Sequence, residues 1–333
     1  MQQTHINQAT YDKENIHSFN NFKNLRQGNR KVFGKQIQNF SKQPISTKNI
    51  LTERTLKTEV EQKPVEQPPI SNPQVAEPFQ ANILAYLKSR LSLYYTDKDY
   101  MNRQKDINTR MRSILIDWLV DVNLKFKLLP QTLFMTVNII DRYLSIRQVS
   151  RSELQLVGIA ALMIVGKYEE IYPPLLKDYI AVCDNAYTRE DIIKMEENII
   201  SALEFNLTQP SSLYFLQLLQ QKLKLEAKPL AFAQYILETI LLDMECLKFN
   251  NLTLVAGAVF LVNKIFKRGS WTYEYTLLCG VSEQDAKACA KELYIIMQQV
   301  DSAGLTAIKR KFSEPKYFEV SRYKIEKVSG SRH

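Results

Sequence analysis

The stretch "LQLVGIAALMIV", residues 154–165, is the strongest indication of the fold, because it runs for twelve residues without a charged side chain. A helix that is apolar on every side has to be surrounded by other elements. The stretch "LTLVAGAVFLVN", residues 252–263, aligns with it without gaps 98 positions later. Both contain small residues, among them Gly158, Ala160, Gly257 and Ala258, that allow neighbouring helices to approach closely. The repeat predicts two copies of one helical unit, each built around a buried central helix.

Apolar residues recur at helical spacing around each stretch, and the alternation typical of strands is rare. The first copy is predicted to contain helices at 111–126, 131–146, 151–170, 174–183 and 188–204. The second is predicted to contain helices at 211–224, 229–247, 251–267, 271–279 and 282–300. Expected N-caps are Thr188 with Asp191, Ser282 with Asp285, and Ser150 or Ser152. The sequence therefore predicts an all-α fold with two tandem five-helix units.

The segments outside these helices differ in composition. Residues 1–78 are rich in Gln, Asn, Lys and Ser and end in "KPVEQPPISNPQVAEP", which is typical of a disordered arm followed by a proline-rich linker. A short N-terminal helix is expected from Phe79. The predicted domains are the arm at 1–78, the short helix and first unit at 79–207, the second unit at 208–311, and a tail at 312–333.

Composition excludes several classes of protein. The 333 residues carry a net charge of +9, but the basic residues form few dense blocks, so direct nucleic-acid binding is not expected. The histidines are confined to positions 5, 17 and 333, which leaves the core without a histidine nucleophile system or a histidine-ligated metal. No glycine-rich phosphate loop is present, and we expect no cofactor. No signal peptide or membrane-spanning run is visible.

The four cysteines are widely spaced, which indicates neither a zinc site nor a disulfide framework and favours a reducing compartment. They are Cys183, Cys246, Cys279 and Cys289.

The stretch "GKYEEIYPP", residues 166–174, combines Lys167 with the adjacent acids Glu169 and Glu170. Consecutive helical residues point about 100° apart, so these two carboxylates do not converge on one substrate atom as a catalytic pair must. A solvated helix end fits them better, although acids at a helix C-terminus are opposed by the macrodipole. A surface recognised by another protein is the remaining interpretation.

The stretch "MRSILIDWLVDV", residues 111–122, has two apolar faces. Met111, Leu115 and Trp118 share one face, while Ile114 and its apolar neighbours occupy another. Such a helix is either wholly buried or has one core face and one exposed docking groove, because methionine and tryptophan are common at binding surfaces. The charged Arg112 in this stretch and Asp141 in "DRYLS" are predicted to form a structural ion pair between two helices.

Four stretches resemble the cyclin box of A- and B-type mitotic cyclins. They are "MRSILIDWLVDV", "TLFMTVNIIDRYLS", "LQLVGIAALMIVGKYEEIYPP" and "YTREDIIKMEENIISALEFNL". The similarity extends from about Phe79 to Lys311 and is weaker in the second half. It implies two tandem cyclin folds and a regulatory subunit that binds and activates a cyclin-dependent kinase without an active site of its own.

The resemblance also implies which residues contact the kinase. Lys167 and Glu196 would form the polar centre of the contact, surrounded by Tyr168, Ile200 and Leu207, where Tyr168 replaces the usual Phe. The N-terminal helix would add Phe79, Ile83 and Tyr86, which lie at i, i+4 and i+7.

The resemblance implies in addition a groove that captures Arg-x-Leu motifs of substrates and inhibitors, with Asp121 meeting the basic residue of the ligand. The groove would consist of Met111, Ile114, Leu115, Trp118, Asp121, Leu154 and Gln155.

The polar arm contains two short degradation signals. "KEN", formed by Lys13, Glu14 and Asn15, is one, and "RKVFGKQIQN" (30–39) resembles a destruction box with Arg30 in place but Phe33 where leucine is expected. A ubiquitin ligase of the anaphase-promoting type is therefore an expected partner, and we expect the protein in nucleus and cytoplasm, with no membrane partner. The alternative function is a transcription-factor-like cyclin fold that binds DNA or basal factors.

Overall fold

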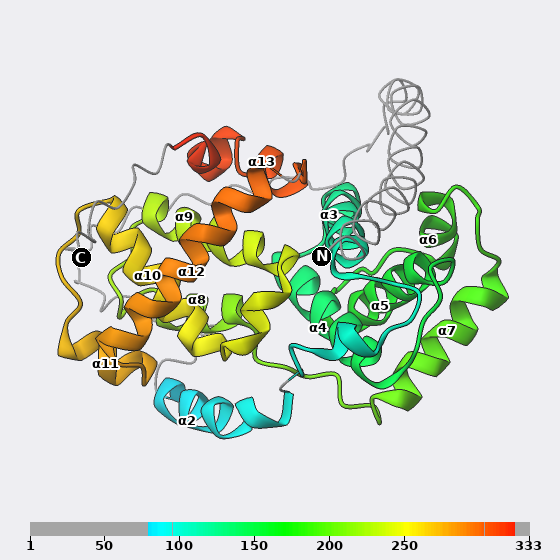
Figure 1. Cartoon of the computed structure of the whole chain (residues 1–333), viewed down its shortest axis with the longest axis horizontal. Coiled ribbons are helices and arrows are strands. Elements are labelled where there is room, and N and C mark those ends of the chain that lie inside the picture. Colours follow the sequence, from blue (N-terminus) through cyan, green and yellow to red (C-terminus); the bar gives the residue numbers. More distant parts are fainter. Residues whose placement is uncertain (1–78, 95, 303, 324–333) are drawn as a thin grey trace, which may run out of the picture. The chain divides into compact units, whose positions relative to one another are not determined.

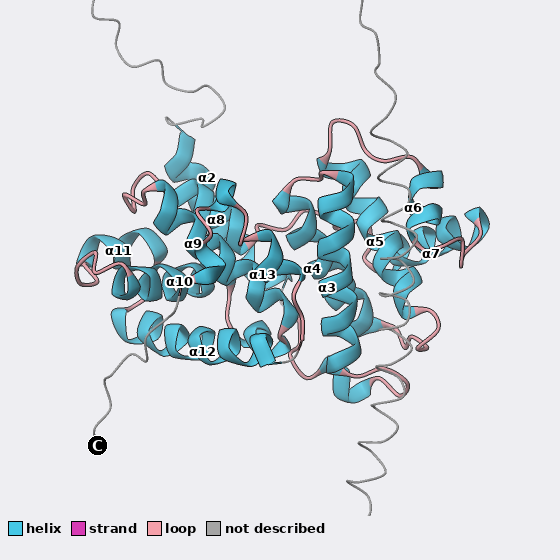
Figure 2. Ribbon diagram, turned by 90° about the horizontal axis from the view of Figure 1, so that it is seen from above, coloured by secondary structure: helices cyan, strands magenta, loops and turns pink. Residues whose placement is uncertain are grey.

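A computed structural model of the chain describes residues 79–94, 96–302 and 304–323. Within these ranges the backbone forms helices, turns and loops and contains no strand (Figure 2). The predicted disordered arm and both degradation signals lie outside the described residues. The two helical repeats belong to one compact unit, residues 82–333.

The described helices of residues 82–333 follow the predicted order. The first repeat consists of α3 (Thr109–Phe126), α4 (Pro130–Ile146), α5 (Leu154–Glu169), α6 (Leu176–Val182) and α7 (Arg189–Ala202). The second repeat consists of α8 (Ser212–Leu219), α9 (Ala227–Thr239), α10 (Asn251–Ile265), α11 (Tyr273–Cys279) and α12 (Glu283–Ser302). The prediction of an all-α fold with two tandem five-helix units is confirmed.

Short elements surround the two repeats. They are α2 (Gln80–Arg90), α13 (Ala307–Lys311) and the 3-10 turns η3 (Leu91–Tyr94), η4 (Tyr100–Arg103), η5 (Ile240–Leu242), η6 (Met244–Lys248), η7 (Pro315–Tyr317) and η8 (Val320–Arg322). The predicted tail at 312–333 thus begins with ordered turns.

The two apolar stretches form α5 and α10, the central helices of their repeats (Figure 1). Helix α5 contacts α3, α4, α6 and α7, and α10 contacts α8, α9, α11 and α12. The predicted role of the small residues is clear at two glycines. A Cβ on Gly158 would lie 2.7 Å from a methyl of Leu115 on α3, and a Cβ on Gly257 would lie 2.6 Å from Cys289 Sγ on α12. These close approaches leave no room for a side chain.

Local capping explains where several helices begin. At α7, Thr188 and Asp191 form the predicted capping box, with each side chain bonded to the other residue's backbone N–H. At α12, Asp285 N–H donates to Ser282 Oγ over 3.1 Å, as predicted. The prediction of a serine cap for α5 is wrong, because α5 begins after Glu153 and Ser150 Oγ instead donates to the carboxylate of Glu153.

The prediction of one helix across 229–247 is also wrong. Helix α9 ends at Thr239 and continues as two 3-10 turns separated by Asp243, whose backbone is extended. The Asp243 side chain accepts from Glu245 N–H at 2.7 Å and so caps the second turn. Apolar periodicity continues through the break, which is why the sequence did not reveal it. The break leaves backbone carbonyls without intrahelical donors. Side chains of α3 in the first repeat donate hydrogen bonds to two of them.

Helix α13 follows the second repeat in the sequence and contacts one helix of each repeat. Its first residue, Ala307, donates its N–H to Asp117 Oδ1 on α3 in a buried hydrogen bond of 2.8 Å. Its last residue, Lys311, forms a 2.7 Å ion pair with Glu238 on α9, and both side chains are almost fully buried. These two contacts hold α13 against α3 and α9.

Candidate functional site

The side chains of Lys167 and Glu196 meet at the surface of the first repeat. Lys167 is in the last turn of α5, where its charge complements the helix dipole, and Glu196 is on the adjacent helix α7. They form an ion pair across 29 positions of sequence. The Lys167 side chain is 50% exposed and that of Glu196 is 16% exposed. Lys167 is therefore available to a partner while Glu196 holds it in place.

Apolar side chains surround this ion pair and form with it what we call the Lys167 surface. Tyr168 is 48% exposed, and its hydroxyl hydrogen-bonds Thr208 Oγ1 in the segment that follows α7. Ile200 on α7 and Leu207 in the same segment are partly exposed. The structure thus brings together Lys167, Glu196, Tyr168, Ile200 and Leu207 from two separate parts of the sequence.

Three further exposed apolar residues, in the segments that follow α5 and α7, were not predicted. Phe205 follows α7 and is 76% exposed, while Ile171 and Tyr172 follow α5 and are 86% and 91% exposed. Glu204 and Phe205 both have positive φ angles, 51° and 58°, which is uncommon for residues with a side chain. In the sequence, Ile171 and Tyr172 directly precede two prolines, and Phe205 lies just beyond the predicted end of a helix. Large apolar residues at such positions are not expected to be buried. Such exposure is typical of an interaction surface.

The two adjacent glutamates have different roles. Glu170 Oε1 accepts hydrogen bonds from Leu129 N–H at 2.7 Å and from the hydroxyl of Thr132, at the start of α4. It therefore caps α4 at its positive end, which explains why an acid is tolerated just beyond the end of α5. The pKa of Glu169 is raised by burial and further by the charge of Glu170. Neither glutamate is placed as half of a catalytic pair.

The predicted contact residues of the N-terminal helix are accessible. Phe79 is 61% exposed, Tyr86 is 59% exposed, and Ile83 is partly exposed. Further along α2, Lys88 Nζ donates to the backbone carbonyl of Leu278 over 3.2 Å, close to the C-terminus of α11. This contact fixes the end of α2 on the second repeat. It also places the positive charge of Lys88 at the negative end of the α11 dipole, which is a favourable interaction.

The predicted docking groove on α3 needs a correction. Met111, Leu115 and Leu154 are 3%, 1% and 0% exposed, so they belong to the core and do not line an accessible groove. The physical reason is the close packing of α3 on α5, in which Leu115 lies against Gly158. The partly exposed members of the predicted set are Ile114, Trp118, Asp121 and Gln155, which we call the α3 face.

The acid of the α3 face already has a partner within the chain. Asp121 forms an ion pair with Arg310 of α13, 189 positions later in the sequence. The Asp121 side chain is 32% exposed and that of Arg310 is 48% exposed. The sequence indicated no partner for Asp121 because α13 is far from α3 along the chain.

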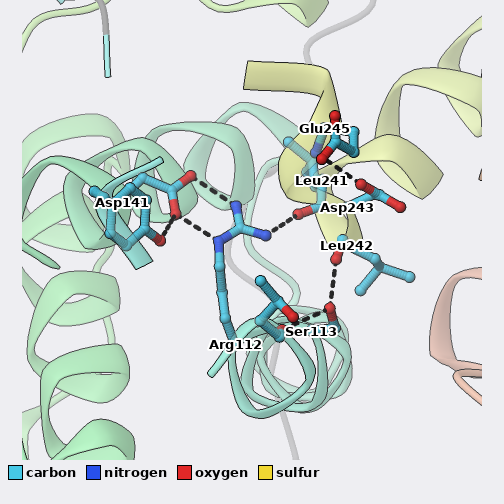
Figure 3. Close-up of polar contacts among 9 residues, drawn as sticks. Arg112, Ser113, Asp141, Leu241, Leu242, Asp243 and Glu245 are labelled. Carbon is cyan, nitrogen blue, oxygen red and sulfur yellow. Dashed lines mark hydrogen bonds and ion pairs between the residues drawn. The ribbon is translucent and has the colours of Figure 1, made fainter. Parts of the chain in front are cut away.

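The charged pair predicted between Arg112 and Asp141 lies in the core (Figure 3). Arg112 Nε and Nη2 donate to the two carboxylate oxygens of Asp141 over 2.6 and 2.7 Å, and the Tyr100 hydroxyl donates to the same carboxylate over 2.8 Å. Burial alone would lower the pKa of Arg112, but the negative charge of Asp141 raises it above its ordinary value. The pair is a structural element whose two side chains are 1% and 3% exposed.

Arg112 also connects the two repeats. Its Nη1 donates to the carbonyl of Leu241 over 3.0 Å, and the neighbouring Ser113 hydroxyl donates to the carbonyl of Leu242 over 2.6 Å (Figure 3). These are carbonyls of η5, freed where α9 breaks. Arg112 therefore fixes α3 to α4 through its ion pair, and together with Ser113 it fixes the first repeat to the second through hydrogen bonds.

Among the described residues, no group of three or more histidine, cysteine or acidic side chains could hold a metal ion. In the same ranges, no helix is both long and apolar enough to cross a bilayer. All four cysteines are buried and free, and burial raises the pKa of each thiol.

Comparison with known proteins gives matches to two family descriptions and to several relatives. Residues 82–208 match "Cyclin, N-terminal domain" and residues 210–326 match "Cyclin, C-terminal domain". The chain is 36% identical over 223 residues to G2/mitotic-specific cyclin-B of Hydra vulgaris, covering 67% of this chain and 62% of the relative. It is 36% identical over 238 residues to Cyclin-B2-1 of Arabidopsis thaliana, covering 71% of this chain and 56% of the relative.

The chain thus spans less than two thirds of the length of these relatives. Among solved structures, a viral cyclin from herpesvirus saimiri has a similar fold, with a TM-score of 0.59 at 20% identity, covering 67% of this chain and 98% of that one.

Proposed function

The chain belongs to the cyclin family, and from that premise we propose that it is a non-catalytic subunit that binds and activates a cyclin-dependent protein kinase. The observation that carries the proposal is the Lys167 surface, where an accessible ion pair is surrounded by exposed apolar side chains. A monomeric protein rarely leaves so many large apolar residues in contact with water at one place. A protein partner that covers them would bury the apolar area and enclose the ion pair.

The ion pair suits the centre of such a contact. Glu196 is mostly buried already and limits the motion of Lys167, so little side-chain entropy remains to be lost when a partner binds. The ammonium group of Lys167 has three donors and can hold backbone carbonyls of the kinase while it stays paired with Glu196. Around it, Tyr168 and Phe205 provide aromatic contact area of the kind that dominates binding energy at interfaces.

Activation follows from binding one conformation of the kinase better than another. Phosphoryl transfer requires a lysine–glutamate pair and a metal-binding aspartate of the kinase to be assembled together. A cyclin whose surface fits only the assembled arrangement shifts the kinase population toward it by the difference in binding free energy. The chemistry then belongs wholly to the kinase. Phe79, Ile83 and Tyr86 of the N-terminal helix are proposed as further kinase contacts.

The α3 face is proposed to recruit substrates and inhibitors that contain Arg-x-Leu motifs. Trp118 and Ile114 offer partly exposed apolar area for the leucine, and Gln155 offers an amide for the peptide backbone. Asp121 is a partly exposed acid on α3, three residues beyond Trp118.

The time and place of action are proposed from the family and from the polar arm. Relatives named as G2/mitotic cyclins support a role in the cell cycle around mitosis. The KEN and destruction-box signals would allow an anaphase-promoting ubiquitin ligase to remove the protein, and we expect nuclear and cytoplasmic residence.

The test is kinase activation by the purified full chain, with a mitotic cyclin-dependent kinase and a basic peptide substrate. The double variant Lys167→Ala/Glu196→Ala should bind the kinase much more weakly and should not activate it. The matched control is Lys316→Ala/Glu314→Ala, which removes an exposed lysine–glutamate pair of 2.8 Å elsewhere and should activate like the unaltered chain. If all three proteins activate equally, the assignment of the Lys167 surface is wrong.

If the unaltered chain neither binds nor activates any such kinase, the family resemblance has preserved only the fold. Salt-dependent binding to DNA would then favour the transcription-factor-like alternative.

A further inference from the structure

The acid that would recognise the basic residue of a docking motif is occupied from within the chain. Asp121 on α3 is paired with Arg310 on α13. A docking peptide that brings its own arginine to Asp121 would therefore meet a carboxylate that already has a guanidinium beside it. Two positive charges that share one carboxylate repel each other, and this repulsion offsets part of their attraction to the acid.

The position of Arg310 is set by the helix on which it lies. Helix α13 is tied to α3 by the hydrogen bond from Ala307 N–H to Asp117, and to α9 by the buried ion pair between Lys311 and Glu238. Both ties lie within three residues of Arg310. The guanidinium can leave Asp121 by rotating its own side chain, but it remains close to the acid even then.

We propose that Arg310 determines the charge specificity of the α3 face, by neutralising Asp121 so that a basic residue in the ligand adds little to binding. Arg310 is the more exposed partner, at 48% against 32% for Asp121, so an approaching peptide meets the positive charge first. Recognition then depends on the apolar contacts with Ile114 and Trp118. This inference rests on the docking function proposed above.

The test compares two fluorescent peptides that differ only in the basic residue, Arg-x-Leu and Ala-x-Leu, binding to the full chain. The unaltered chain should bind both with affinities within about twofold of each other, because Arg310 already neutralises the acid that the peptide arginine would use. The Arg310→Ala variant should bind the Arg-x-Leu peptide about two- to fivefold more tightly and the Ala-x-Leu peptide unchanged. Raising the salt concentration should remove the gain.

Two further variants separate the explanations. Arg322→Ala removes an exposed arginine that pairs with Glu319 rather than with α3, and it should leave both affinities unchanged. Adding Asp121→Asn to Arg310→Ala should abolish the gain, because the acid that the peptide arginine would use is gone.

The outcomes distinguish this inference from the docking function beneath it. If peptides bind but Arg310→Ala changes both affinities equally, or neither, Arg310 does not determine charge specificity and the inference is overturned. If neither peptide binds to the unaltered chain or to any variant, the docking function itself is refuted, and the inference with it. A gain confined to the Arg-x-Leu peptide and to chains that retain Asp121 would establish it.

Discussion

Replacing Asp141 by asparagine should destabilise the whole folded unit, because it leaves the Arg112 guanidinium buried without a counter-charge. The substitution keeps the size of the side chain, so packing changes little. In the native structure the guanidinium makes two hydrogen bonds to Asp141 and one to the carbonyl of Leu241. In the variant one amide oxygen can still accept a hydrogen bond, but the negative charge is absent.

The expected loss is about 3 kcal/mol, the lower end of the range for removing one partner of a buried ion pair, because the amide retains part of the hydrogen bonding. The hydrogen bond between the Tyr100 hydroxyl and residue 141 can persist with the amide oxygen as acceptor. For a folded unit of this size, such a loss corresponds to a decrease in melting temperature of about 6–12 °C.

The assay is thermal unfolding of the full chain followed by circular dichroism, with urea unfolding as a second measure. A triple variant, Tyr100→Phe/Arg112→Met/Asp141→Leu, removes the hydroxyl, the guanidinium and the carboxylate together. It should recover most of the lost stability, because apolar residues of similar volume often replace a buried ion pair without cost. The carbonyl of Leu241 loses a donor in this variant, which limits the recovery.

Two results would refute this reasoning. A decrease of less than about 2 °C for Asp141→Asn would mean that the buried guanidinium finds compensation that the structure does not contain. A triple variant as unstable as the single one would mean that the cluster contributes through shape rather than through charge.

Further predictions concern close helix packing, capping and buried thiols. Gly257→Ala should destabilise the fold by about 1–3 kcal/mol and more than Gly158→Ala. The added Cβ at Gly257 would also meet a backbone nitrogen at 3.2 Å, whereas the one at Gly158 meets only side-chain atoms of Leu115. Equal losses in urea unfolding would contradict this. Glu170→Ala should cost about 1 kcal/mol through loss of the α4 cap, while Glu169→Ala should cost less, and the reverse order in thermal unfolding would refute the capping role. Stability should fall as pH rises above about 9, because unfolded thiols lose protons there, whereas the pKa of Cys279 in the native state is about 11. The Cys279 thiol contributes a decline of about 1.4 kcal/mol per pH unit within that window. Cys279→Ala should therefore make the decline in urea-derived stability between pH 9 and 11 shallower, and an unchanged slope would count against it.

The pattern of apolar residues was sufficient to predict most of the helices and their division into two repeats. Local spacing determines which residues of a helix need burial, and capping pairs such as Thr188 with Asp191 act within one turn. The break of α9 was missed, because an apolar run continues through it and the donors that satisfy its free carbonyls come from α3. A local pattern contains no information about such a distant donor.

The candidate sites were predicted less completely than the fold. The residues of the Lys167 surface were identified through resemblance to a family, and the structure adds Phe205, which lies beyond a helix end and outside any apolar period. The resemblance places Met111 and Leu115 in a groove, whereas both are buried, because the close packing of α3 on α5 is not visible in the sequence.

Two all-helical repeats around apolar central helices follow from the local pattern of the chain, since burial of an apolar face is set by residues close together in sequence. The partner of each charged or polar side chain follows instead from the packing of elements that are distant in sequence. Asp121 meets Arg310 from 189 positions away, and Glu170 caps a helix that begins 40 positions before it. A charge indicates that a partner is needed, but the partner's identity depends on which distant elements the packing of the core brings together.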